Sequence, residues 1–385
     1  MFEKLKNRII TLKGKKPELQ DFKDDNSVAY LSAEYLRDGK LTQFAKIDSV
    51  SDKYFCTEND LLIIWDGSNS GEVFMGKEGI LSSTMAKIEV NDNLYLKKYL
   101  YYFLKNNFEI LNEKVTGAAI PHLNRSTLEN LEIYKASLAE QKEIVDVLDA
   151  ADRIISLRTA CIESAQDLIP ALFQEMFSKY ANSQSRIKLN YLFEFKSGGT
   201  PSKQVKEFFT GKIPWVTTIA LNKLFIDQND ANELITEDAI KKSSTKLIPA
   251  NSLLFGTRVG IGKLAINKVP MCTNQDIAAL IPLKNNNLNL IYTYWYLKQI
   301  NKFFVANGRG ATIKGITTNL VKNTEIILPP MEQQELFAEK VQEIEAYIKT
   351  QQAELENAKT MFQSLLHHSF TGELTRHKFG GDANG

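Results

Sequence analysis

Two short segments of the chain combine glycine with lysine or threonine, at residues 13–16 (KGKK) and 196–200 (KSGGT). Glycine lets main-chain amide groups approach a phosphate closely, and lysine adds a positive charge beside it. This combination predicts contacts to the phosphates of a polyanion rather than covalent catalysis.

Residues 65–69 (WDGSN) and 256–260 (GTRVG) form a second pair of polar segments. Arg258 carries the forked group that binds guanine through two hydrogen bonds, and Asp66 is suited to accept one from cytosine N4. Asn69 has the amide that pairs with adenine. These side chains predict readout of base edges.

Two further pairs of segments complete the predicted surface, residues 82–84 with 273–275 and residues 116–122 with 308–314. Taken alone, each segment is slightly better explained as a turn with a solvated polar tip. Because four pairs occupy matching positions in the chain, we expect a shared nucleic-acid-binding surface. The predicted contacts are Lys13, Lys15, Lys16, Asp66, Ser68, Asn69, His122, Lys196, Ser197, Gly198, Thr200, Thr257, Arg258, Lys263, Asn274, Gln275, Arg309 and Lys314.

Motifs typical of catalytic and cofactor sites are missing from the sequence. Residues 256–264 (GTRVGIGKL) have the wrong spacing for a phosphate loop, and Leu264 stands where serine or threonine must hold magnesium. Residues 328–331 (LPPM) lack the polar and aromatic ends of an amino-methyltransferase loop. There is no HExxH, Cys/His cluster, GxGxxG after a strand or GxSxG elbow. We therefore expect no catalytic residue, metal or cofactor on this chain.

The net charge of +1 conceals strong segregation of charge. Residues 181–330 carry 19 basic and 9 acidic side chains, whereas residues 137–180 carry 4 and 8. Residues 331–385 are again acidic, with 5 and 9, and residues 1–136 are nearly balanced, with 19 and 20. A basic block of this size indicates a polyanionic partner, although a solvated lysine-rich surface explains it equally well by itself.

The composition is that of a globular protein: 385 residues, 43% hydrophobic and 24% charged, enough for two or three domains. No run of about 18 apolar residues suits a membrane span, and the N-terminus lacks the apolar stretch of a secretory signal. Cys56, Cys161 and Cys272 are far apart and odd in number, which suits a reducing compartment. We expect a cytoplasmic protein without membrane contact.

The chain repeats itself at a spacing of about 193 residues, half its length. The order of the repeat is globular unit, long helix, globular unit, long helix. The matching segments are 117–133 with 310–326, 58–62 with 250–254, 137–144 (SLAEQKEI) with 329–336 (PPMEQQEL), and more weakly 13–17 with 197–201 and 28–36 with 213–221.

Each long helix is indicated by apolar residues at alternating steps of four and three, the a/d seam of a coiled coil. The polar residues Arg158 and Gln351 occupy the same step of the two seams, which we expect to pack antiparallel with these two residues near each other. Pro170 predicts a kink or an early end of the first helix. The other seam residues are Ile144, Leu148, Ala151, Ile155, Ile162, Ala165, Ile169, Leu172 and Met176, then Phe337, Val341, Ile344, Ile348, Leu355, Ala358, Phe362, Leu365 and Ser369.

The predicted fold class is α+β: two mixed α/β domains related by the repeat and joined by two long antiparallel coiled-coil helices. Apolar runs at 61–65, 253–256 and 277–283 predict strands, and 94–107 and 288–300 predict helices whose aromatic side chains belong to the core. The predicted boundaries are 1–136 and 181–328 for the two domains, 137–180 and 329–374 for the two helices, and 375–385 for a flexible tail.

The sequence resembles a known family, the specificity (S) subunit of Type I restriction–modification enzymes, over nearly its whole length. The residues that carry the resemblance are 308–334, 213–218 (IPWVTT), 197–202 (SGGTPS), 369–374 (SFTGEL), 116–124 (TGAAIPHLN) and 65–71 (WDGSNSG).

The resemblance implies two target recognition domains, each reading one half of a split sequence in double-stranded DNA. It implies that the helices set the spacing of the halves and dock two modification subunits, which bind S-adenosylmethionine and methylate adenine. A restriction subunit would add translocation and cleavage driven by ATP with Mg²⁺. The chain itself would be non-catalytic and bind no cofactor.

The first domain departs from this pattern, because only about a dozen residues precede KGKKP while the second domain has a lead-in from residue 181. We expect either support from the tail at 375–385 or a reduced leading segment.

Two other functions remain open on the residues alone. One is a free-standing two-headed DNA-binding regulator, and the other is a coiled-coil adaptor that binds no nucleic acid. The acidic helices favour the S subunit, because a protein that binds only DNA gains little from them, whereas partner subunits can grip them.

Overall fold

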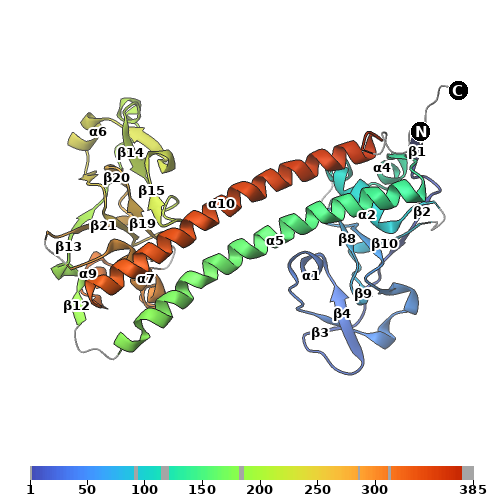
Figure 1. Ribbon diagram of the computed structural model, residues 1–385, viewed down its shortest axis with the longest axis horizontal. Coiled ribbons are helices and arrows are strands. Elements are labelled where there is room, and N and C mark those ends of the chain that lie inside the picture. The colour runs from blue at the N-terminus through green and yellow to red at the C-terminus, as the bar shows by residue number, and fades with distance from the viewer. Residues whose placement is uncertain are drawn as a thin grey trace. The chain divides into compact units, whose positions relative to one another are not determined.

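The computed structural model describes residues 2–90, 94–113, 121–181, 186–284, 287–310 and 314–374. The chain forms two compact units: unit 1 comprises Met1–Ala160 and Gln352–Gly385, and unit 2 comprises Cys161–Gln351. Two long helices, α5 (Leu138–Phe177) and α10 (Met331–Phe370), each contribute one half to each unit (Figure 1). Each unit thus contains one globular head and two half-helices.

The head of unit 1 contains a four-stranded sheet of order β2-β10-β7-β8, a five-stranded sheet of order β3-β5-β4-β9-β6 and the pair β1-β11. Its strands are β1 (Phe2–Lys4), β2 (Ile9–Lys13), β3 (Leu19–Gln20), β4 (Ser27–Leu31), β5 (Phe44–Lys46), β6 (Phe55–Cys56), β7 (Leu61–Ile64), β8 (Val73–Met75), β9 (Gly79–Leu81), β10 (Met85–Val90) and β11 (Glu132–Tyr134). Its helices are α1 (Ala33–Asp38), α2 (Lys97–Asn106), α3 (Phe108–Leu111) and α4 (Arg125–Asn130).

The head of unit 2 contains sheets of order β13-β21-β18-β19-β15 and β16-β14-β20-β17 and the pair β12-β22. Its strands are β12 (Arg186–Lys188), β13 (Phe193–Ser197), β14 (Ile213–Val216), β15 (Phe225–Ile226), β16 (Glu233–Ile235), β17 (Leu247–Ile248), β18 (Leu253–Gly256), β19 (Leu264–Asn267), β20 (Met271–Thr273), β21 (Ile277–Pro282) and β22 (Glu325–Ile327). Its helices are α6 (Glu237–Lys241), α7 (Leu290–Gln299), α8 (Asn301–Ala306) and α9 (Thr318–Lys322).

The two heads share one topology. The antiparallel series β2-β10-β7 corresponds to β13-β21-β18, and the parallel pair β4-β9 corresponds to β14-β20. The strands predicted at 61–65, 253–256 and 277–283 and the helices predicted within 94–107 and 288–300 are all present. Tyr99 and Tyr292 are buried at equivalent positions, so the aromatic residues of these helices belong to the core, as expected.

A buried glutamine joins each head to its long helix. Gln141 Oε1 accepts a hydrogen bond from the Leu96 amide (2.8 Å), and its Nε2 donates to the carbonyls of Leu94 (2.8 Å) and Ala136 (3.0 Å). In unit 2, Gln334 makes the same three bonds, to Asn289, Asn287 and Pro329.

Each of these positions lies about 193 residues beyond its counterpart. The segment match had placed Gln141 opposite Gln333, and the hydrogen bonds correct that register by one residue.

The predicted antiparallel pairing of the long helices is present in both units. In unit 1 the first half of α5 packs against the second half of α10, where Ile144, Leu148 and Ala151 share a core with Phe362 and Leu366. In unit 2 the second half of α5 meets the first half of α10, and Phe173 and Phe177 contact Phe337 edge-on at ring separations of 5.4 Å.

The predicted seam residues all lie on the shielded sides of α5 and α10. Those that are buried are Ile144, Leu148, Ala151, Ile162, Ala165, Ile169, Phe337, Val341, Ile348, Ala358, Phe362 and Ser369. Those that are half-buried are Ile155, Arg158, Leu172, Met176, Ile344, Gln351, Leu355 and Leu365.

The polar step of the α5 seam is occupied by an ion pair inside unit 1. The guanidinium of Arg158 contacts the carboxylate of Glu354, which follows Gln351 by one turn of α10. Downstream, α5 continues through Pro170 to Phe177, so the proline does not end the helix. Because Pro170 has no amide hydrogen, the helix lacks one main-chain hydrogen bond at this position.

The lead-in segments of the two heads are equivalent, contrary to the expectation that the first is shortened. Strand β1 pairs with β11 as β12 pairs with β22, and Glu3 opposite Ile133 corresponds to Ile187 opposite Ile326. The apparent difference arose from counting the connection after α5 as part of the second head. The tail at 375–385 lies outside the described residues. Among the residues that are described, no helix has the length and apolarity needed to cross a membrane.

We predict that Gln141→Ala destabilises unit 1, because it leaves the Leu96 amide and the Leu94 carbonyl without their shared partner in a buried position. The expected loss is about 2–4 kcal/mol of the free energy of unfolding, measured by urea denaturation. Lys142→Ala, one residue along and exposed, is the control and should change the stability by less than about 0.5 kcal/mol. Equal losses in the two variants would contradict the role of the glutamine.

Candidate nucleic-acid interface

The two glycine-containing segments follow equivalent strands of the two heads. Strand β2 ends at Lys13, paired with Ala86, and β13 ends at Ser197, paired with Ala278. The next amides, of Gly14 and Gly198, donate to the carbonyls of Met85 (2.9 Å) and Ile277 (3.2 Å).

A Cβ atom at either glycine would overlap a neighbouring carbonyl oxygen, that of Ser82 or of Asn274. Close packing of the main chain therefore requires glycine at both positions. The structure gives Gly198 this packing role.

The segments at 65–69 and 256–260 are each anchored by two main-chain amides that donate to one carbonyl. The amides of Trp65 and Asp66 both donate to the Thr84 carbonyl, at 2.8 and 3.0 Å. The amides of Thr257 and Arg258 both donate to the Asp276 carbonyl, at 2.8 and 3.4 Å. Asp66 thus corresponds to Arg258, and Thr84 corresponds to Asp276, one residue beyond the predicted segment 273–275.

A third segment crosses each of these turns. Asp66 forms an isolated β-bridge with His122, and Arg258 forms one with Gly315, which is also bridged to Arg309. His122 and Gly315 are about 193 residues apart and therefore equivalent. The matching residues Thr116 and Gly117 of the first repeat lie outside the described residues.

Three of the predicted residues of unit 1 form one charged cluster. Asp66 Oδ2 lies 2.7 Å from Lys13 Nζ, and Asp66 Oδ1 lies 2.7 Å from His122 Nδ1. The Asp66 side chain is only 19% exposed, whereas those of Lys13 and His122 are 47% and 59% exposed. Burial alone would raise the pKa of Asp66, but the hydrogen bonds and charges of Lys13 and His122 outweigh it and lower the pKa.

The corresponding cluster of unit 2 is centred on Asp276. Its Oδ1 lies 3.8 Å from Arg258 Nε, and its Oδ2 accepts a hydrogen bond from Asn274 Nδ2 at 3.2 Å. The Thr257 hydroxyl donates to the Asp276 carbonyl at 3.0 Å. Beside this cluster the Thr200 hydroxyl donates to Gln275 Oε1, so the segments at 196–200 and 273–275 meet.

Apart from Thr257, the other predicted residues have no side-chain bond to these clusters in the part of the chain that the structure describes. Lys196 is half-buried beside Glu194, with 3.5 Å between Nζ and Oε1. Gly198 and Thr257 are buried. The residues that are simply exposed are Lys15, Lys16, Ser68, Asn69, Ser197, Lys263, Arg309 and Lys314.

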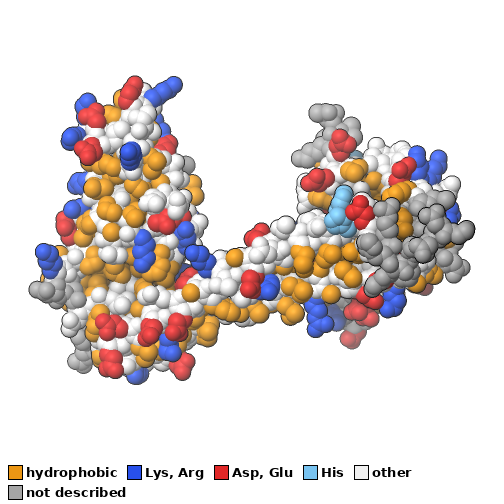
Figure 2. Space-filling view, turned by 45° about the horizontal axis from the view of Figure 1, so that its top comes forward, with side chains coloured by type: hydrophobic (Ala, Val, Ile, Leu, Met, Phe, Trp, Pro, Cys, Tyr) orange, Lys and Arg blue, Asp and Glu red, His pale blue; other side chains and the backbone are white. Residues whose placement is uncertain are grey.

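Sequence reasoning missed Asp276 and Gly315, whereas Thr84 lies in the predicted segment 82–84. Asp276 directly follows the predicted segment TNQ, and Gly315 is the repeat partner of His122, so the corrected register would have found both. In Figure 2, Lys and Arg side chains are spread over the face of unit 2 that is drawn, with carboxylates among them.

A duplicated α/β head whose turns expose cations, carried on a pair of antiparallel helices, defines a modular nucleic-acid-recognition protein. Residues 7–165 and 185–358 match the family described as the Type I restriction modification DNA specificity domain. The chain belongs to this family, and the internal repeat corresponds to two copies of its domain. Its role is DNA sequence recognition as a specificity subunit of a Type I restriction–modification system.

Individual relatives agree with this assignment. The chain is 28% identical to the Type I restriction enzyme MjaVIII specificity subunit of Methanocaldococcus jannaschii, over 94% of this chain and 90% of that protein. Among solved structures it is similar to a Type I S subunit from M. genitalium, with a TM-score of 0.62, 18% identity and 96% of each chain covered. A structure from a study of Type I R-M complex assembly has a TM-score of 0.60 and 15% identity, covering 97% of this chain and 98% of that one.

We predict that Lys13→Ala raises the pKa of Asp66, because it removes the ammonium group that hydrogen-bonds to the carboxylate and stabilises its negative charge. A lowered pKa stabilises the fold at pH above the pKa of the unfolded chain, and this contribution disappears as the pH falls through the folded pKa. Carbon-13 NMR titration of the Asp66 carboxyl group, assigned with Asp66→Asn, measures the shift. Lys23→Ala is the control. An unchanged Asp66 titration in Lys13→Ala would show that the ion pair is absent in solution.

Proposed function

We propose that this chain is the DNA-recognition scaffold of a Type I restriction–modification complex, and that each head reads one half of a bipartite target. In this proposal the long helices set the spacing of the two halves and dock two modification subunits. Those subunits would bind S-adenosylmethionine and methylate adenine, while a restriction subunit would use ATP and Mg²⁺.

The observation that carries the proposal is that the two heads share their anchoring hydrogen bonds but differ in the side chains that they expose. Asp66 and Arg258 hold the same position, as do His122 and Gly315. A common scaffold with different side chains at its turns is expected if the two heads read different base sequences, since base edges are distinguished by donor and acceptor patterns.

The helices suit the proposed role of a spacer. Helices α5 and α10 are each 40 residues long, and each runs without interruption through parts of both units. A continuous helix of this length extends about 60 Å, and packing against a second helix stiffens it. Such a connection supports a fixed separation between half-sites better than a flexible linker would.

A surface for a partner subunit is available on the helices of unit 1. Ile154 and Leu157 of α5 are 41% and 56% exposed, and Ala150 is exposed one turn before them. These three residues, which we call the outer stripe, follow the a/d spacing and lie about 100° around the helix from the buried seam. Figure 2 shows hydrophobic side chains at the surface along the helices. An apolar stripe on a charged helix is typical of a protein-binding face.

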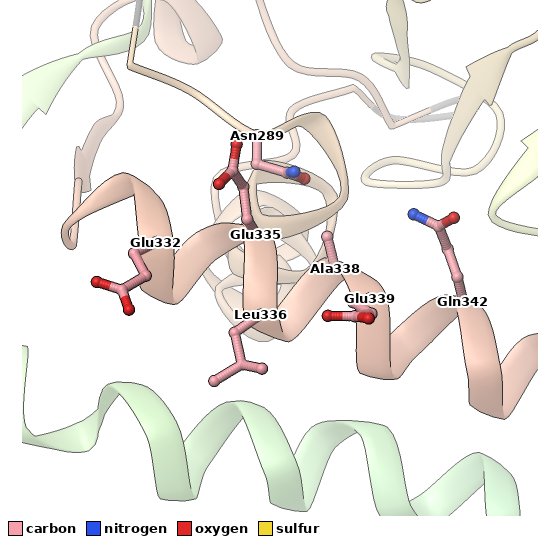
Figure 3. A pocket seen from close by; sticks show the side chains of 7 residues that line it. All are labelled: Asn289, Glu332, Glu335, Leu336, Ala338, Glu339 and Gln342. Carbon is pink, nitrogen blue, oxygen red and sulfur yellow. The ribbon is translucent and has the colours of Figure 1, made fainter.

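Unit 2 offers a different surface, an acidic groove of about 490 Å³ on the first turns of α10. Glu332, Glu335 and Glu339 line it together with Asn289, Leu336 and Gln342. In Figure 3, Leu336 points toward the neighbouring α5 ribbon, whereas Glu335 points to the side of Asn289. The groove supports docking of a partner with basic side chains, and it repels DNA phosphates. Partner subunits are thereby favoured over a free-standing regulator.

Exchange of one head provides the direct test of the proposal. Replacing residues 181–328 by the equivalent head of a relative should change one half of the methylated motif and leave the other half and the spacer length unchanged. Methylome sequencing of cells that express the chain with its modification subunits reads out the motif. A change in both halves, or in the spacer, would refute the assignment of one half-site to each head.

Docking is tested at the outer stripe. Leu157→Glu should reduce co-purification of the modification subunit at least tenfold, because a charge would be buried in an apolar interface. Ser156→Glu introduces the same charge on the other side of the seam, at an exposed position, and is the matched control. Both variants should keep the unfolding temperature of the parent chain. Equal co-purification of the two variants would exclude the stripe as a docking surface.

A further inference from the structure

We infer that Asp66 and Asp276 are the positioning residues of the two DNA-reading heads: each is a shielded carboxylate that orients more exposed side chains, Lys13 and His122 in unit 1 and Arg258 in unit 2. This inference rests on the proposed function and deepens it, because it assigns which side chains contact DNA and which act through them. It also reassigns Asp66, whose residue type alone suggests a direct contact to cytosine.

In unit 2 the Asp276 carboxylate is more shielded from solvent than the Arg258 side chain that it contacts. The Asp276 side chain is 13% exposed and Arg258 is 50% exposed, with Oδ1 of the first 3.8 Å from Nε of the second. The main-chain carbonyl of Asp276 also accepts the Thr257 and Arg258 amides, so one residue holds both the turn and the arginine side chain. In the described part of the chain, Arg258 has no other ion pair.

The pairing leaves the two terminal nitrogens of Arg258 for another acceptor. Guanine offers O6 and N7 side by side, which matches two parallel donors of a guanidinium. A carboxylate at Nε restricts rotation of the side chain and reduces the conformational entropy lost on binding. Arg258 is therefore suited to read guanine as long as Asp276 holds it.

Gly315 makes room for the arginine side chain. A Cβ atom at this position would lie 2.7 Å from Arg258 Cγ, and the Gly315 main chain pairs with Arg309 on its other side. A side chain at 315 would therefore displace Arg258 from Asp276. The equivalent residue of unit 1 is His122, whose Nδ1 lies 2.7 Å from Asp66 Oδ1.

In unit 1 the carboxylate lies at a different position of the same turn, and its partners come from two other segments, at Lys13 and His122. The carboxylate stands at the position equivalent to Arg258, and Thr84 stands at the position equivalent to Asp276. Both oxygens of Asp66 are already engaged, at 2.7 Å from Lys13 and from His122, and the side chain is 19% exposed. Such a carboxylate is poorly placed to contact a base, whereas its two partners are exposed.

Double-mutant cycles separate a positioning role from a direct contact. The protein is the full chain with its modification subunits, and the probe is a pool of DNA duplexes carrying the methylome-derived motif with each base pair varied in turn. For unit 2 the variants are Arg258→Ala, Asp276→Asn and the double variant. For unit 1 they are Asp66→Asn, Lys13→Ala with His122→Ala, and the triple variant.

Arg258→Ala should lower discrimination at one guanine of the unit 2 half-site by about tenfold or more. Asp276→Asn should lower it at the same base pair by a smaller factor and should have no further effect when Arg258 is absent. Gly315→Ala should relax the same position. In unit 1, Asp66→Asn should weaken binding only while Lys13 and His122 are present.

Asp48→Asn in unit 1 and Asp238→Asn in unit 2 are matched controls, because each removes one carboxylate charge of its head at a side chain that hydrogen-bonds or ion-pairs elsewhere. Their base preferences should equal that of the parent complex. Thermal unfolding of every variant distinguishes lost contacts from lost fold.

The outcomes are distinguishable. If the parent complex selects no motif, the proposed function fails. If it selects a motif but Asp276→Asn weakens all duplexes equally, or acts fully in the absence of Arg258, then Asp276 is not a positioning residue. An effect of Asp66→Asn that persists without Lys13 and His122 would restore Asp66 as a direct base contact.

Discussion

The hydrogen bonds of one buried glutamine in each unit couple the DNA-recognition head to the long helix. Gln141 and Gln334 are fully buried, and each satisfies main-chain groups before α2 or α7 and before its own helix. Leaving a buried amide without these partners costs more free energy than the hydrogen bonds contribute when they form. The junction between head and helix therefore has little freedom to shift. Head and half-helix can therefore act as one body within a unit, which is the condition for a helix to set where a head meets DNA.

The periodic parts of this architecture are predictable from sequence because packing imposes a spacing on the residues that pack. The seams from Ile144 to Ile169 and from Phe337 to Phe362 follow directly from steps of four and three. Exact register is less accessible, because adjacent glutamines at 333 and 334 match Gln141 equally well by residue type. Only the bonds to Asn287, Asn289 and Pro329 distinguish them, and these partners are distant in sequence.

The candidate site was predictable in its residue types but not in its pairings. Glycine-flanked cations at 13–16 and 256–260 indicate a DNA-binding surface, yet the partners of Asp66 come from two other segments, at Lys13 and His122. Asp276 follows the predicted segment 273–275, and its contacts to the turn at 257–258 are made in space rather than along the chain. Such contacts cannot be predicted from the residues adjacent in sequence. The residue type does not settle the role either, because a carboxylate can contact a base directly or support a cation.

The two heads carry different charges on one scaffold, which is the arrangement that our proposal of two readers with different specificities requires. The amides at 65–66 and 257–258 bind a carbonyl, and this bond is independent of side-chain identity. Side chains at 66, 84 and 122, or at 258, 276 and 315, can therefore change together while the turn keeps its shape. If these carboxylates orient their partners as we propose, each head must keep one, because an exposed side chain without a support would lose orientation and hence selectivity. The two heads meet this condition with carboxylates at different positions, because Asp66 stands at the position of Arg258 and Asp276 stands at the position of Thr84.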